Sequence, residues 1–104
     1  MTRSIEELVA QARVDGASDI HLVCGIAPRY RIDGALADIP GTAPLDSTES
    51  ESYAYELAGK RYDAIRDIGE LDMAKTISGV RIRINLFRQK GSVSAALRLL
   101  SDVI

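Results

Sequence analysis

"GVRIRINLFRQKG", residues 79–91, alternates aliphatic and polar side chains over most of its length. Side chains of a β-strand point alternately to opposite faces of the sheet, so this pattern predicts a strand with two unlike faces. The aliphatic face carries Val80, Ile82, Ile84 and Leu86. The polar face carries Arg81, Arg83, Asn85 and Phe87. The stretch therefore predicts a sheet that is buried on one side and presents two arginines on the other.

Further strands are expected on both sides of this stretch. Asp33-Gly34 is the strongest hairpin signal in the sequence, because both residues readily adopt the left-handed backbone of a two-residue turn. Similar turns are expected at Ser78-Gly79 and Lys90-Gly91. In all, six strands are predicted, at residues 18–24, 29–33, 35–39, 70–77, 80–89 and 92–100.

The remaining segments predict helices. Ser4 and Glu7 have the spacing of a capping box, and Gly16 ends the apolar pattern that follows them. Asp46, Ser47 or Thr48 can cap a second helix. The predicted helices cover residues 4–14, 49–58 and 60–67. The sequence is thus expected to form a single α+β domain over residues 1–104.

Composition limits the classes of function. The 104 residues suffice for one ordinary core, and the net charge of −2 argues against a general binder of nucleic acid or of membrane surfaces. The charge is uneven, because residues 73–101 hold basic residues and no acidic one. Cys24 is the one cysteine, which excludes an internal disulfide, and its apolar surroundings predict a small buried side chain. No signal peptide or long apolar run is present, so we expect a cytoplasmic protein.

Sequence motifs for catalysis are missing. A phosphate-binding P-loop needs a glycine-rich turn followed by Lys and Ser or Thr. Here Gly59-Lys60 is followed by Arg61, and Ala54 stands where the first glycine belongs. His21 is the one histidine, so two-histidine metal sites are excluded. We expect no catalysis from this chain alone.

The arginine face has two interpretations. Charged strand residues most often face solvent, and Glu70 or Asp72 on the adjacent strand could then pair with the arginines. Guanidinium groups without such partners, held in line on a rigid strand, would instead suit a phosphate or carboxylate ligand.

Four motifs, in this order and spacing, resemble the N-terminal domain of the type IV pilus retraction ATPases, within the type II/IV secretion ATPase superfamily. They are "GASDIHL" (16–22), "PRYRIDG" (28–34), "GELD" (69–72) and "RIRINLFRQKG" (81–91). The turn from Gly25 to Pro28 is more similar to the retraction branch than to the secretion and extension branches.

The resemblance implies a PAS-like domain, in which helices pack on one face of a curved antiparallel sheet of about six strands. It also implies a longer parent protein, with a RecA-like domain downstream that binds ATP and Mg²⁺ through a P-loop. In the family the motor is a homohexamer that drives twitching motility, works at the cytoplasmic side of the inner membrane and engages a pilus platform protein there.

The resemblance further implies that Arg83, with Arg81 and Arg98, reaches the triphosphate held by the RecA-like domain. No catalytic role is assigned to His21 or Asp33, whose motifs are equally well explained as a strand entry and a hairpin turn. Two other classes stay open: a PAS-like sensor of a small ligand or interaction domain, and a binder of single-stranded nucleic acid. The second is the weaker, because the basic strand offers one aromatic platform, Phe87.

Overall fold

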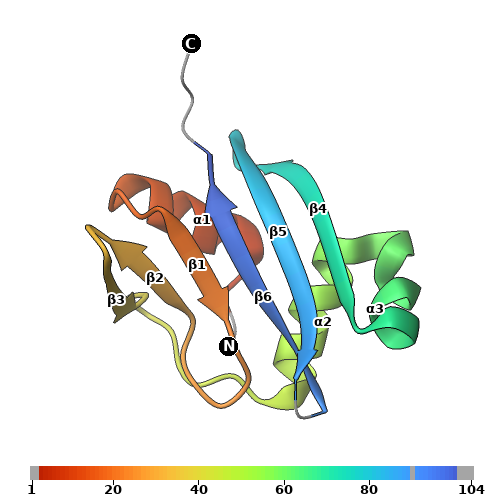
Figure 1. Cartoon of the computed structure of the whole chain (residues 1–104). Helices are drawn as coiled ribbons and strands as arrows, with labels where there is room; N and C mark the ends of the chain where they lie inside the picture. Colours follow the sequence, from red (N-terminus) through yellow and green to blue (C-terminus); the bar gives the residue numbers. More distant parts are fainter. Residues whose placement is uncertain (1–2, 90, 101–104) are drawn as a thin grey trace.

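Six antiparallel strands form one twisted sheet, and the α-helices lie on one of its faces (Figure 1). The structure is a computed structural model, and it describes residues 3–89 and 91–100. In chain order the elements are α1 (Ile5–Val14), β1 (Asp19–Leu22), β2 (Arg29–Ile32), β3 (Ala35–Asp38), α2 (Ser47–Ala58), a 3-10 turn (Gly59–Arg61), α3 (Tyr62–Ile68), β4 (Glu70–Ile77), β5 (Val80–Gln89) and β6 (Ser92–Leu99).

The strand order across the sheet is β3-β2-β1-β6-β5-β4, and every neighbouring pair is antiparallel. β1–β3 and β4–β6 are each a run of sequential strands. The pairing of β1 with β6 joins the two runs into one sheet, with Asp19 opposite Arg98 and Leu22 opposite Ala95. The predicted α+β fold is confirmed.

Two tight hairpins set the register of the sheet as the sequence predicts. Asp33 and Gly34 have φ angles of 51° and 83°, and Ser78 and Gly79 have 51° and 75°. Two successive positive φ angles match the twist of the flanking strands, and glycine adopts them without steric penalty. The third predicted turn includes residue 90, which lies outside the described residues.

The capping signals also form as expected. In α1 the Ser4 hydroxyl accepts from the Glu7 N–H, and the Glu7 carboxylate accepts from the Ser4 N–H. Asp46 and Glu49 make the same reciprocal pair at the start of α2, which therefore begins two residues before the predicted position. Such caps satisfy N–H groups that the first turn of a helix leaves without partners.

The helix-covered face holds the core. On β5 the side chains of Ile82, Ile84 and Leu86 are at most 2% exposed, whereas Arg81 and Arg83 on the alternate positions are exposed. Leu8 and Val9 of α1 are buried in the same cluster. The alternation read from the sequence thus separates the two faces correctly. The face without helices, called here the open face, carries the polar side chains.

One strand prediction needs correction. The strand expected at 18–24 ends at Leu22, because the chain turns away at Val23 and Cys24 forms an isolated parallel bridge with Leu45. Cys24 is half-buried, so the prediction of a buried side chain is wrong. The Gly25 N–H donates to the Leu45 carbonyl at 2.8 Å, which holds this segment against the loop before α2 instead of in the sheet.

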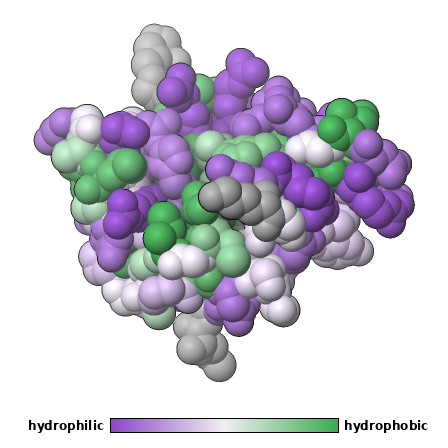
Figure 2. Space-filling view, turned by 60° about the horizontal axis from the view of Figure 1, so that its bottom comes forward, coloured by the Kyte–Doolittle hydropathy of each residue, from purple (hydrophilic) through white to green (hydrophobic). Residues whose placement is uncertain are grey.

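Apolar side chains reach the surface in small patches among hydrophilic ones, as shown in Figure 2, where the lower end of the molecule in Figure 1 is turned toward the viewer. The large apolar side chains that are exposed come from different segments of the described chain: Val14, Ile26, Leu36, Tyr55 and Ile68. Within residues 3–89 and 91–100, no helix combines the length and apolar character needed to span a bilayer.

Candidate functional site

Charged residues form a line across the open face. In the register of the sheet Arg83 of β5 lies opposite Arg98 of β6, Arg98 lies opposite Asp19 of β1, and Asp19 lies opposite Arg31 of β2. Directly paired residues of antiparallel strands share a face, with Cβ atoms about 4.5–5.5 Å apart. We call these four residues the arginine row. Its formal charge is positive, with three arginines and one carboxylate.

A second line of residues runs beside the arginine row. It consists of three polar residues and one alanine, each paired with the next across the sheet: Asp72 on β4, Asn85 on β5, Ala96 on β6 and His21 on β1. The Asn85 amide donates to the Asp72 carboxylate at 2.9 Å. The methyl group of Ala96 leaves room in the middle of the sheet.

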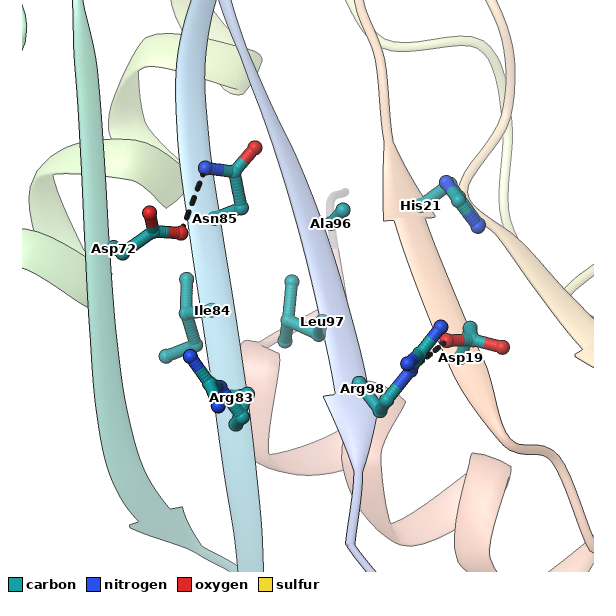
Figure 3. A pocket seen from close by; sticks show the side chains of 9 residues that line it. All are labelled: Asp19, His21, Asp72, Arg83, Ile84, Asn85, Ala96, Leu97 and Arg98. Carbon is teal, nitrogen blue, oxygen red and sulfur yellow. Dashed lines mark hydrogen bonds and ion pairs between the residues drawn. The ribbon is translucent and has the colours of Figure 1, made fainter.

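All members of the two lines except Arg31 border a hollow of about 320 Å³ on the open face (Figure 3). Figure 3 shows Arg98 directed toward Asp19, Asn85 directed toward Asp72, and Arg83 on β5 at the level of Arg98. The hollow is lined by Asp19, His21, Asp72, Arg83, Ile84, Asn85, Ala96, Leu97 and Arg98.

Arg98 is tied to Asp19. The Arg98 Nε donates to the Asp19 carboxylate at 3.2 Å, and the Ser18 hydroxyl donates to the same carboxylate at 2.7 Å. Arg31 lies on its other side, with Nε 3.8 Å from the carboxylate. Burial raises the pKa of Asp19, but the hydrogen bonds from Ser18 and Arg98, together with the nearby positive charge, lower it by more, so the pKa lies below its ordinary value. Asp19 is therefore a carboxylate at neutral pH.

Arg83 differs from Arg98. It is exposed, and within the described residues it makes no hydrogen bond or ion pair. Its direct neighbours across the strands are Ala74 on β4 and Arg98 on β6. Neither can neutralise it, so its guanidinium donors are directed at solvent and are available to an anionic ligand.

Of the three arginines named from the sequence, the structure brings two together. Arg83 and Arg98 are direct neighbours and both line the hollow. Arg81 lies on the same face of β5 but two residues away, and its Nη1 donates weakly to the Thr76 hydroxyl at 3.4 Å. It does not line the hollow.

The partners considered for a solvated arginine face are wrong. Glu70 lies opposite Phe87 and Asp72 lies opposite Asn85, so the register places neither carboxylate opposite an arginine. Within the arginine row the carboxylate is Asp19, which pairs with Arg98 of β6 and belongs to the motif that the sequence explains as a strand entry.

The remaining candidates have simpler roles. His21 lines the hollow, whereas Asp33 occupies the β2–β3 hairpin turn and does not line it. Within residues 3–89 and 91–100 no three His, Cys, Asp or Glu side chains are grouped in a way that could hold a metal ion.

Comparison with known proteins identifies relatives. No protein-family model matches the chain. Over 102 residues, 96% of the chain, it is 32% identical to the type IV pilus retraction ATPase PilT of Pseudomonas aeruginosa. Over 99 residues, 93% of the chain, it is 33% identical to the uncharacterized protein YggR of Escherichia coli. The chain spans 29% of the length of each of these relatives.

Solved structures agree. A crystal structure of the pilus retraction motor PilT with bound ADP superposes with a TM-score of 0.89 at 35% identity, over 98% of the chain and 30% of the motor. The ATPase DotB of Legionella pneumophila gives a TM-score of 0.76 at 18% identity, over 93% of the chain and 28% of that protein, which shows a shared fold.

Proposed function

The chain has the sequence and fold of the N-terminal domain of the secretion ATPase family that includes PilT, and we propose that it is the arginine-bearing regulatory domain of a pilus retraction motor. The observation that carries this proposal is Arg83: an exposed arginine on a rigid central strand, with an alanine on one side and a second arginine on the other. An arginine that has no partner of opposite charge beside it in its own domain is well suited to an anionic ligand supplied by another domain.

The ligand would be the triphosphate of ATP, held by a RecA-like domain downstream in the parent protein. That domain would supply the P-loop and Mg²⁺, since the chain described here has neither a P-loop nor a grouped set of metal ligands in its described residues. ATP supplies the phosphoanhydride bond whose cleavage drives the motor. Arg83 would contact the terminal phosphate, Arg98 would lie beside it, and Arg81 would add positive charge at the edge of the site.

Arginine suits this task because it stays charged and can grip a phosphate with two parallel hydrogen bonds. Loss of the terminal phosphate removes one partner of the guanidinium, and the sheet can then move as a rigid body relative to the RecA-like domain. In a homohexamer, each such movement would be passed to the neighbouring subunit and to the pilus platform at the inner membrane, the basis of twitching motility.

A second candidate is a PAS-like sensor of a small ligand. The hollow of about 320 Å³ reaches the size of small-ligand sites. Such sites are, however, mostly apolar and enclose their ligands, whereas this hollow lies on the face without helices and is bordered by charged groups. A small molecule that stays bound through purification would favour the sensor.

The test of the motor proposal uses the full-length parent protein with Arg83→Ala and Arg83→Glu. Loss of one charge-assisted hydrogen bond amounts to about 1.5–3 kcal/mol, which lowers the ATPase rate by about 10- to 150-fold. Glu should be worse than Ala, because it places a carboxylate against a polyanion. Thermal stability should stay close to that of the parent.

Arg66→Ala is the matched control. Arg66 is an exposed arginine of α3 whose ion pairs are with its helix neighbours Asp63 and Asp67, away from the hollow. Its loss should leave the ATPase rate unchanged. An Arg83→Glu motor that hydrolyses ATP at the parental rate would mean that the strand faces only water.

A further inference from the structure

Asp19 is the one carboxylate of the arginine row, and its place in the row is central. Its side chain is 16% exposed, whereas the Arg98 side chain beside it is 72% exposed. The Ser18 hydroxyl fixes one side of the carboxylate at 2.7 Å, and Arg98 reaches it from the next strand at 3.2 Å. The acid is thus the anchored partner, and Arg98 is the partner free to swing.

Arg98 lies between two neighbours of opposite charge. Arg83 is its direct neighbour on β5 and repels it, while Asp19 is its direct neighbour on β1 and attracts it. Both act in the same direction, and they turn the Arg98 guanidinium away from Arg83 (Figure 3). The ion pair is solvent-exposed on the arginine side, so it is weak and can open when a stronger anion arrives.

We infer that Asp19 is a positioning residue that holds Arg98 away from Arg83 and thereby limits the affinity of the open face for polyanions. This inference rests on the proposed function, and it assigns different roles to Arg83 and Arg98. Arg83 meets the phosphate directly. Arg98 can contact the phosphate only when it leaves its ion pair with Asp19.

Such a restraint has a physical use in a motor. Two free arginines beside each other would bind a polyanion tightly and release it slowly, because each adds a charge-assisted contact. When the ligand loses charge, Arg98 returns to Asp19, and the ligand keeps only its contact with Arg83. The affinity of the open face therefore falls as the negative charge of the ligand falls.

The test uses the 104-residue chain with inorganic tripolyphosphate as the probe, measured by calorimetry at low ionic strength. Arg83→Ala should weaken binding about tenfold or more, since it removes a direct charge-assisted contact. Asp19→Asn should strengthen binding about two- to fivefold, because it frees Arg98 from a weak surface ion pair. Asp19→Glu, which keeps the negative charge, should stay near the parental affinity.

The matched control is Asp38→Asn. Asp38 pairs with Arg29 at 3.0 Å on the open face, so this substitution makes the same charge change and releases an arginine that, like Arg31, lies outside the hollow. It should change tripolyphosphate binding by much less than Asp19→Asn. Equal gains from the two substitutions would show that net charge alone matters and would overturn the inference.

NMR of the arginine Nε–Hε groups separates positioning from a general charge effect. Tripolyphosphate should shift the Arg83 signal in both the parent chain and Asp19→Asn, whereas the Arg98 signal should shift strongly only in Asp19→Asn. If Asp19→Asn does not fold, Arg98→Ala decides. A loss of affinity as large as that of Arg83→Ala would overturn the inference, because Arg98 would then already be engaged in the parent.

The outcomes distinguish this inference from the proposed function. A motor whose ATPase depends on Arg83, together with tripolyphosphate binding that is indifferent to Asp19, would keep the proposed function and remove the role of Asp19. A motor indifferent to Arg83 would remove the proposed function whatever Asp19 does.

Discussion

Replacing Arg83 by Thr should stabilise the isolated chain, although Arg83 lies at the centre of the candidate site. Its direct neighbour Arg98 has the same charge, and its other neighbour, Ala74, has none. Like charges directly opposite in a sheet destabilise it by about 0.2–1 kcal/mol, in line with about 1 kcal/mol for two charges 4 Å apart in water. Since Asp19 offsets part of the Arg98 charge, we expect a gain of about 0.5 kcal/mol in the free energy of unfolding.

Urea unfolding and thermal unfolding, both followed by circular dichroism, measure this gain. For a chain of this size, about 0.5 kcal/mol corresponds to a rise of about 2–4 °C in Tm. The electrostatic part should shrink in 1 M NaCl, where the screening length falls to about 3 Å. Any gain that persists at high salt would come from the better strand propensity of Thr instead.

Arg98→Thr is the matched control, because it removes the same repulsion from the same row. It also removes the hydrogen bond to Asp19 and leaves that carboxylate with fewer partners, so its net effect should be neutral or destabilising. If Arg83→Thr instead lowers stability by more than about 0.5 kcal/mol, Arg83 has a stabilising role in its own domain. The claim that it is held for an external ligand would then lose its basis.

Two further predictions concern stability away from the site. Lys75 donates from Nζ to the main-chain carbonyls of Glu56 and Leu57 at the end of α2. Lys75→Met should therefore lower the free energy of unfolding, measured in urea, by about 1 kcal/mol. The control Lys60→Met should change it by less than about 0.5 kcal/mol. Burial raises the pKa of Tyr53 to about 12, so the folded state favours the neutral phenol. The free energy of unfolding should therefore fall as the pH rises from about 10 toward 12. Tyr53→Phe should reduce this fall in alkaline titrations followed by circular dichroism.

The sequence by itself determined the order and type of most elements and the faces of the central strand. Strand alternation separates Ile82 and Ile84 from Arg81 and Arg83 because neighbouring side chains point to opposite sides of a sheet, a property of the backbone that needs no tertiary information. Capping residues and two-residue turns are equally local. Caps act through side chains of neighbouring residues, and the turns depend on glycine, which reaches positive φ because it has no Cβ, so the hairpin at Asp33 could be placed to the residue.

The tertiary structure alone decided which strands lie beside each other. Asp19 and Arg98 are 79 residues apart in sequence and become neighbours only because β6 lies between β1 and β5. Alternation gives the face of a side chain but not its neighbour, since a shift in register by two residues preserves every face. For that reason the sequence suggested Glu70 and Asp72 as partners of the β5 arginines, whereas the packed sheet leaves Arg83 without an ion pair among the described residues and pairs Asp19 with Arg98 of β6.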